Sequence, residues 1–356
     1  MPLIGKLAGA LGLGTVLWLW IDWHEATATL AAADPRLVAL ALLASVASVL
    51  VSVRKWQRLL DRIELRLGFG ILARLYWIGS FFSNFLPTGV GGDAVRLLLT
   101  PAEGRLSAVA GSILVERLTG LLVMLLLAAT GLALQPLALA DLWFQETLLA
   151  AVLALAAAVA AVLLAPRLFL VALDRLGAFV PGRLRGPFAK VRKIADGIVG
   201  PACDREAVAG AILYSVPFYA ANIVAQFWVL RAVGAEITLA QVTLAAPVIL
   251  LVGILPITIN GLVLAEGAFV VIYAGCGVSP EIALAAALLR RVIDLANSSA
   301  GGLLWLGWPV GATAPLANPM AATLAQARLH RDAAYDELLA QPALRRLRYR
   351  VGGHAA

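Results

Sequence analysis

Charged residues are scarce in this chain. They make up 14% of its 356 residues, against about 25% in an ordinary soluble domain, whereas 62% are hydrophobic and the mean hydropathy is +0.91. Too few charges are present to cover the surface of a soluble protein of this length. The composition therefore excludes an ordinary soluble domain and predicts an integral membrane protein.

Cysteine and histidine are also rare, which limits the chemistry that the chain can support. Cys203 and Cys276 make no disulfide framework, and His24, His330 and His354 are too scattered for a metal site. No Ser-His-Asp or Cys-His set is apparent. We therefore expect no catalytic residue, no metal and no cofactor.

Long apolar runs, by contrast, are frequent. A crossing of the bilayer needs roughly 20 apolar residues. The first run ends in Asp22, Trp23 and Glu25 rather than in a small-residue cleavage site, so we interpret it as a retained crossing and not as a signal peptide. The segments predicted to cross are 5–21, 37–53, 106–133, 144–165, 207–233 and 282–308.

Lysine and arginine are distributed unevenly between the connections. Five lie in 54–66, eight in 166–206 and six after position 313, whereas the opposite connections contain only Arg36. Because basic connections stay in the cytoplasm, we predict that both termini are cytoplasmic.

Two further apolar regions, 69–100 and 238–276, are interrupted by proline and glycine. With six crossings and both termini inside, the first region must begin and end on the cytoplasmic face and the second on the outer face. Each is therefore predicted to be a re-entrant helical hairpin, because irregular backbone at that depth must be buried in protein or line a wet cavity. The predicted hairpin tips are Pro87, Gly89, Gly91, Gly92, Pro256, Asn260 and Gly261.

The two hairpins are similar in sequence. "FLPTGVGGDAVR" and "ILPITINGLVLAEGAF" both contain Leu-Pro, a break with glycine and one acid. Asp93 precedes Arg117 by 24 residues, and Glu266 precedes Arg290 by 24. This pattern predicts an inverted-topology repeat, 69–133 and 238–308, whose broken helices form a transport site near the membrane midplane.

These motifs also resemble those of a known family. "NFLPTGVGGDAVR" with "ERLTGLL", and "LPITINGLVLAEGAF" with "LLRRVIDL", look like the paired signatures of the lysylphosphatidylglycerol synthase transmembrane region family, also called the flippase-like domain family. The resemblance covers about residues 10–310 and implies a multi-pass protein of the bacterial inner membrane that moves lipid headgroups between leaflets. Only about 45 residues follow, so we expect no aminoacyl-transferase domain and no lysyl-lipid synthesis.

Charged residues inside the predicted helices form the candidate translocation site. Each costs at least ~2.5 kcal/mol at the bilayer centre, so these groups should pair or face water. Arginine forks suit a lipid phosphate, and carboxylates suit an amine or a proton relay. The predicted substrate-binding residues are Asp93, Arg96, Glu116, Arg117, Asn222, Gln226, Glu266, Arg290, Arg291 and Asp294.

A structural interpretation of the same charges stays open. Asp93 and Arg96 are three residues apart, and Arg290 and Asp294 are four apart, so static pairs within a helix could satisfy several charges and lock the hairpins in place. The polar residues that either join helices or line a path are Ser215, Tyr219, Asn222, Gln226, Asn297 and Ser298.

Basic amphipathic segments lie in the predicted cytoplasmic parts. Trp56, Leu59 and Leu60 share one face of a basic run, as in an interfacial helix on anionic lipid. The net charge of +7 is therefore assigned to topology and anionic lipid, not to nucleic acid. We divide the chain into a flippase-like transmembrane domain, 1–312, and a basic cytoplasmic tail, 313–356.

The sequence thus predicts an all-α polytopic membrane protein with about six transmembrane helices and two re-entrant hairpins in an inverted repeat. We expect a transporter rather than an enzyme, moving a phospholipid, aminoacyl-lipid, hopanoid or other lipid-linked headgroup. The open alternatives are a membrane-embedded glycosyl- or acyltransferase with a lipid-phosphate donor and a non-catalytic partner of a lipid-synthesis complex. A second copy and a lipid-synthesis enzyme are the protein partners considered.

Overall fold

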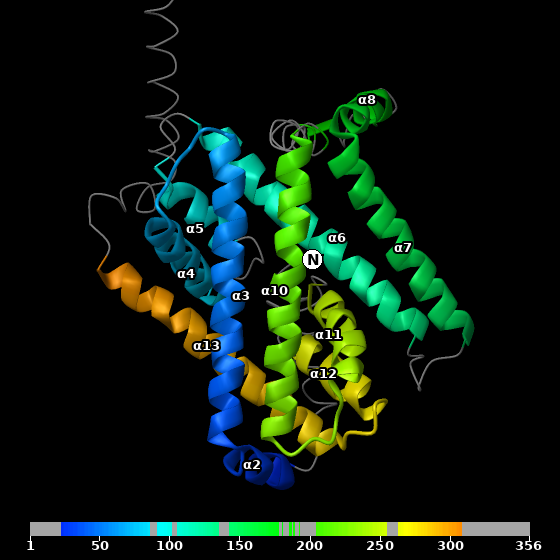
Figure 1. Cartoon of the computed structure of the whole chain (residues 1–356). Coiled ribbons are helices and arrows are strands. Elements are labelled where there is room, and N and C mark those ends of the chain that lie inside the picture. Colours follow the sequence, from blue (N-terminus) through cyan, green and yellow to red (C-terminus); the bar gives the residue numbers. More distant parts are fainter. Residues whose placement is uncertain are drawn as a thin grey trace, which may run out of the picture. The chain divides into compact units, whose positions relative to one another are not determined.

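The computed structural model describes residues 23–85, 91–101, 105–134, 142–177, 204–254 and 263–307, with positions 180, 185, 186, 188 and 192. Within these ranges every regular element is an α-helix, eleven in all (Figure 1), which confirms the all-α prediction. The helices are α2 (Trp23–Ala31), α3 (Pro35–Arg62), α4 (Phe69–Phe85), α5 (Gly91–Leu99), α6 (Leu106–Leu134), α7 (Leu142–Leu164), α8 (Pro166–Gly177), α10 (Arg205–Ala232), α11 (Leu239–Ile254), α12 (Leu264–Ala274) and α13 (Pro280–Leu306).

The long helices α3 and α10 pack side by side and run in opposite directions (Figure 1). Each begins at an aspartate whose carboxylate accepts backbone N–H groups of the first turn, which satisfies donors that a helix leaves free. At one end the Asp34 N–H donates to the Ala232 carbonyl at 2.9 Å, and at the other Arg62 contacts Asp204 at 3.3 Å. The start of α3 therefore lies beside the end of α10, and the end of α3 lies beside the start of α10.

Among the described residues, four helices are long and apolar enough to cross a membrane: α3, α6, α10 and the Gln145–Leu164 part of α7. They match the predicted crossings at 37–53, 106–133, 207–233 and 144–165. The predicted crossing at 5–21 lies outside the described residues. The predicted crossing at 282–308 corresponds to α13, which is continuous over 27 residues but has Arg290, Arg291 and Asp294 near its middle.

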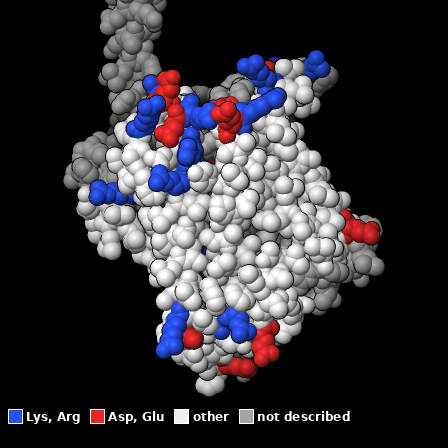
Figure 2. All heavy atoms as spheres, in the orientation of Figure 1, with Lys and Arg blue, Asp and Glu red and all other residues white. Residues whose placement is uncertain are grey.

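The surface of these helices suits a lipid environment. Figure 2 shows a broad uncharged belt between two groups of charged side chains. Large apolar residues are exposed on several helices, including Leu43 of α3, Leu213 of α10 and Leu303 of α13, which is 73% exposed. A soluble protein would rarely expose so much contiguous apolar surface. The fold is therefore that of a polytopic membrane protein.

Both interrupted regions form pairs of packed helices. α4 packs against α5, and α11 packs against α12, with residues 86–90 and 255–262 between the arms lying outside the described residues. Of the predicted tip residues, Pro87, Gly89, Pro256, Asn260 and Gly261 lie in these segments. Gly91 and Gly92 lie instead in the first turn of α5.

Glycine allows the two arms of the first pair to approach closely. A Cβ atom on Gly92 would collide with the Gly79 carbonyl oxygen and with the Ser83 hydroxyl. The absence of a side chain at Gly92 therefore allows α5 to pack closely on α4.

The two pairs are attached to opposite ends of the central helices. In the chain, α4 follows the end of α3 and α11 follows the end of α10. Because α3 and α10 are antiparallel, α4 and α11 begin at opposite ends of this helix pair. Figure 1 accordingly shows α4 and α5 beside the upper half of α3, and α11 and α12 beside the lower half of α10. In the chain, the long helix α6 follows the α4–α5 pair, and the long helix α13 follows the α11–α12 pair. Each of them runs back across the other helices (Figure 1).

The long helices pack reciprocally on the opposite pair. A Cβ on Gly131 of α6 would collide with the Leu244 carbonyl oxygen of α11, and one on Gly301 of α13 would collide with the Trp77 carbonyl oxygen of α4. Each long helix thus touches the backbone of the first arm of the other pair through a glycine.

Candidate functional site

The first group of charges, the α5–α6 cluster, consists of Asp93 and Arg96 from α5 and Glu116 and Arg117 from α6. Arg117 donates from Nε to Asp93 Oδ2 at 2.8 Å and from Nη2 to Asp93 Oδ1 at 2.9 Å. This bidentate pair joins the acid and the arginine that the sequence spacing placed 24 residues apart. The Asp93 carboxylate is buried, whereas 57% of the Arg117 side chain is exposed. One partner of this pair is therefore reachable from outside the protein interior.

Arg96 is held much more tightly than Arg117. Its Nη2 donates to Glu116 Oε2 at 2.6 Å, and its guanidinium lies 4.1 Å from the Trp56 ring centre and 4.3 Å from that of Tyr76. The Tyr76 hydroxyl donates to the other Glu116 oxygen at 3.0 Å. Arg96 is only 2% exposed. A charge enclosed by two aromatic faces and one carboxylate is suited to locking α5 onto α3, α4 and α6.

Lys55 is a buried charged side chain that the sequence analysis did not single out. Its ammonium donates to the Ser215 hydroxyl and to the Glu116 backbone carbonyl, both at 2.7 Å. The sequence pattern of this run predicts an interfacial helix on anionic lipid. Instead α3 continues unbroken to Arg62, and Lys55 is buried beside Trp56. Only the neighbouring helices α6 and α10 make this burial tolerable, because they supply the acceptors.

The second group, the α12–α13 cluster, consists of Glu266 from α12 and Arg290, Arg291 and Asp294 from α13. Arg291 donates from Nε to Glu266 Oε1 at 2.8 Å and also contacts this oxygen through Nη2. Arg290 donates from Nε to Asp294 at 3.0 Å and from Nη2 to Asn222 Oδ1 at 3.0 Å. The partner of Glu266 is thus Arg291, one position beyond the arginine that the repeat spacing indicated.

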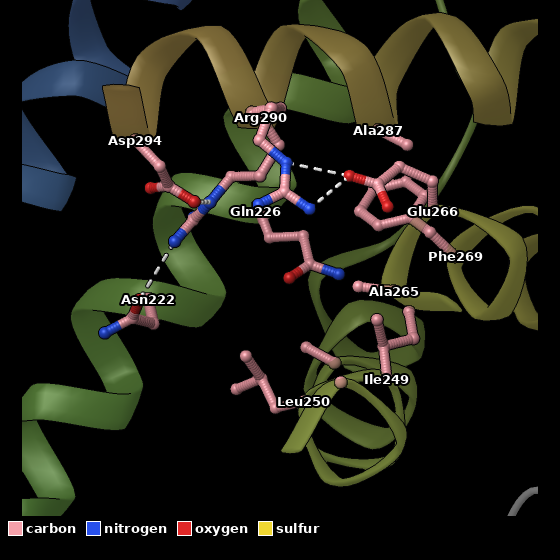
Figure 3. Close-up of a pocket in the computed structure, with 13 residues that line it drawn as sticks. Asn222, Gln226, Ile249, Leu250, Ala265, Glu266, Phe269, Ala287, Arg290 and Asp294 are labelled. Atoms are coloured by element: carbon pink, nitrogen blue, oxygen red, sulfur yellow. Dashed lines mark hydrogen bonds and ion pairs between the residues drawn. The ribbon is translucent and has the colours of Figure 1, made fainter. Parts of the chain in front are cut away.

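A cavity of about 280 Å³ adjoins the α12–α13 cluster (Figure 3). Its polar wall comes from α10, α12 and α13, and its apolar wall includes Ile249 and Leu250 of α11 (Figure 3). The lining residues are Asn222, Gln226, Ala246, Ile249, Leu250, Gly253, Ala265, Glu266, Phe269, Ala287, Arg290, Arg291 and Asp294. The cavity therefore offers both charged groups and apolar surface to one occupant.

Two buried polar atoms of charged residues that line the cavity have no hydrogen-bond partner among the described residues: Glu266 Oε2 and Arg290 Nη1. A buried polar atom without a partner costs ~1–3 kcal/mol, and more when the group is charged. Such atoms in a native protein require an explanation. Since both residues line the same cavity, an occupant that satisfies them is the simplest one.

A polar stripe on α10 connects the two clusters. Ser215 accepts from Lys55, and the Tyr219 hydroxyl donates to the Gly120 carbonyl of α6 at 3.0 Å. Asn222 bonds Arg290 of the second cluster. Only three residues, about 4.5 Å along a helix axis at ~1.5 Å per residue, separate Tyr219 from Asn222. Both lie at the middle of the 28-residue α10.

Further along α13, the polar residues join helices. Asn297 accepts from Trp77 Nε1 and donates to Ser45 Oγ, both at 3.0 Å. Asn84 donates to the Ser298 hydroxyl at 2.6 Å. Asn297 and Ser298 therefore attach α13 to α3 and α4, and do not line the cavity.

Outside the clusters, the basic connection 166–206 is described only in part. In α8, Asp174 accepts from Arg192 Nε at 2.5 Å, and this hydrogen bond lowers the pKa of the Asp174 carboxyl below its usual value.

The tail from 308 onward lies outside the described residues. In the part of the chain that is described, no three His, Cys, Asp or Glu side chains lie together as potential metal ligands.

Comparison with known proteins gives two matches. Residues 6–327 match the profile of the lysylphosphatidylglycerol synthase TM region. The chain is also 22% identical over 310 residues to the UPF0104 membrane protein PH1989 of Pyrococcus horikoshii, an alignment that covers 82% of this chain and 92% of that protein. The family match thus includes both clusters and the cavity.

Proposed function

Since the chain belongs to the lysylphosphatidylglycerol synthase TM region family, we propose that it is a lipid transporter that moves a lipid headgroup between membrane leaflets. The observation that carries this proposal is the cavity beside the α12–α13 cluster, whose charged wall retains two unpaired atoms in the described part of the chain. Charged groups within a membrane protein usually mark a substrate or ion pathway.

The proposal includes six crossings with both re-entrant hairpins entering from opposite faces. The four apolar spans and the placement of the two helix pairs at opposite ends of α3 and α10 support it. A continuous α13 is about 40 Å long at ~1.5 Å per residue, enough to cross a bilayer. The basic connections then face the cytoplasm of a bacterial inner membrane.

The two helix pairs with their long helices act as an inverted repeat in this proposal. Two features support the relation: each unit pairs an acid of its second arm with an arginine of its long helix, and each long helix contacts the first arm of the other unit through glycine. Such repeats place the substrate site where the units meet. The position of Tyr219 and Asn222 at the middle of α10 agrees with a site near the membrane midplane.

Charge exchange is the proposed mechanism. Arg117 of the α5–α6 cluster is more than half exposed, and Arg290 has a nitrogen free of partners among the described residues, so each can accept a headgroup phosphate without losing its protein carboxylate. Arg96 and Glu116, by contrast, are fully enclosed. The static and the translocating roles left open by the sequence are thus divided between different residues.

Reconstituted protein tests the transport activity. Fluorescent lipids in the inner leaflet of liposomes are protected from a membrane-impermeant quencher until they are exchanged outward. We expect exchange by the wild type, a large loss with Arg117→Lys and Arg290→Lys, because a lysine cannot provide a planar fork, and no loss with Arg192→Lys, whose partner Asp174 lies in α8 outside both clusters. Wild-type exchange by both core variants would remove the phosphate-binding role, and absence of exchange for every lipid class would remove the transport function.

Labelling of single cysteines tests the topology in a cysteine-free background. Positions 70 and 104 flank the first hairpin, and Glu236 and Ser279 flank the second; Ser279 is preferred to Gly277, which has a φ of +90° that a side chain would strain. An impermeant thiol reagent should reach the first two positions only from the cytoplasm and the other two only from outside. Labelling of 70 and 104 from opposite sides would mean that the first hairpin crosses the membrane.

A further inference from the structure

Building on the proposed function, we infer that the cavity binds a small zwitterionic group with a primary ammonium and a phosphate, the headgroup chemistry of an ethanolamine phospholipid. Glu266 Oε2 accepts the ammonium, and Arg290 Nη1 donates to the phosphate. These two buried atoms are of opposite charge, belong to residues that line one cavity and have no partner among the described residues.

The charged residues of the cavity wall favour an occupant that is neutral overall. The cavity wall contains Glu266 and Asp294 against Arg290 and Arg291, two charges of each sign. A ligand of net charge would leave one unit of charge uncompensated in the cavity, whereas a zwitterion preserves the balance. Hydrogen-bonding capacity agrees, because the vacant positions are one acceptor on a carboxylate and one donor on a guanidinium.

The size and the apolar wall also agree with a lipid headgroup. A cavity of about 280 Å³ holds about nine groups of water size at ~30 Å³ each, and phosphoethanolamine has about eight non-hydrogen atoms. Ile249, Leu250 and Phe269 offer apolar contact to the adjoining glycerol and acyl chains. A free phosphoethanolamine molecule has the same charges but would leave this wall without apolar contact.

Native mass spectrometry of the purified full chain in detergent tests the inference with lipids that differ only in the headgroup. Phosphatidylethanolamine, its mono- and dimethyl forms and phosphatidylcholine share the phosphate, but only the last has no ammonium N–H. We expect binding through the dimethyl form and a loss of about tenfold for phosphatidylcholine, the effect of one charge-assisted hydrogen bond. Phosphatidylglycerol, which is anionic, should also bind about tenfold more weakly. Equal binding of phosphatidylethanolamine and phosphatidylcholine, or a preference for phosphatidylglycerol, would overturn the inference.

Two variants assign the interactions to atoms. Glu266→Gln should abolish the preference for phosphatidylethanolamine over phosphatidylcholine, whereas Arg290→Lys should weaken both lipids equally because the phosphate is common to them. Glu281→Gln, on the first turn of α13 and away from the cavity wall, should change neither. Because the methylation series uses unaltered protein, the inference remains testable if a variant fails to fold. Retained discrimination in folded Glu266→Gln would refute the ammonium site.

Two further outcomes separate this inference from the transport function. Displacement of the lipid by micromolar free phosphoethanolamine would assign the site to a soluble zwitterion and overturn the lipid reading. Liposome exchange of phosphatidylglycerol without discrimination for ethanolamine would refute the inference and leave the transport function standing. Selective ethanolamine-lipid binding without exchange of any lipid would support the inference and refute the transport function.

Discussion

Replacement of Arg96 by glutamine tests whether the α5–α6 cluster is divided into a locking pair and a translocating pair. The variant removes the 2.6 Å contact between Arg96 and Glu116, both of which are buried. Breaking one side of a buried ion pair costs ~3–5 kcal/mol. Loss of the two contacts with aromatic rings adds ~0.5–1 kcal/mol each. The expected total destabilisation is about 4–7 kcal/mol.

Arg117→Gln is the matched variant in the same cluster. Its side chain is 57% exposed, and Asp93 keeps a second arginine, because Arg96 Nη1 lies 3.5 Å from Asp93 Oδ1. We expect a loss of ~1–2 kcal/mol, smaller than for Arg96→Gln, because the Asp93 carboxylate is buried but still faces Arg96. The midpoint temperature of thermal unfolding in detergent should therefore fall by about 10 °C or more for Arg96→Gln and by only a few degrees for Arg117→Gln, at ~2–4 °C per kcal/mol.

A double variant completes the test. Adding Glu116→Gln to Arg96→Gln removes the carboxylate that the single change left without its charge partner, so the double variant should be more stable than the sum of the single effects by up to ~3 kcal/mol. Equal losses for Arg96→Gln and Arg117→Gln, or strict additivity in the cycle, would refute the division of roles.

Two other substitutions test the packing. Gly92→Ala should destabilise the protein by ~1–3 kcal/mol because its Cβ collides with the backbone of α4, whereas Gly210→Ala, at a helical glycine with nothing within 4 Å, should be neutral or stabilising in the same unfolding assay. Asn297→Leu leaves Trp77 and Ser45 without their partner and should cost about 2 kcal/mol while leaving the relative binding of different headgroups unchanged; altered headgroup preference would place Asn297 in the lipid path.

The sequence by itself determined the membrane class and four of the predicted apolar crossings, and it indicated that Asp93 lies near Arg117. A membrane crossing can be predicted from the composition and length of an apolar run alone. Lipid offers no hydrogen bonds to the backbone, so the run must form a helix, which pairs its own N–H and C=O groups. The proline and glycine breaks in two of the runs have no place in a lipid-facing helix, so they indicated paired helices buried in protein. The Asp93–Arg117 pair was predictable because charges so deep in a membrane protein need partners.

Only the tertiary structure decided which neighbouring charge faces which partner. Arg290 and Arg291 are adjacent, and successive residues of an α-helix point about 100° apart, so the rotation of α13 set by its packing on α4 and α12 gives Glu266 to Arg291 and Asn222 to Arg290. Lys55 likewise faces the interior only because α6 and α10 bring acceptors to it. Residue types and spacing establish that such groups must pair, but the rotation and approach of whole helices, fixed by packing between distant segments, establish which atoms remain free for a ligand.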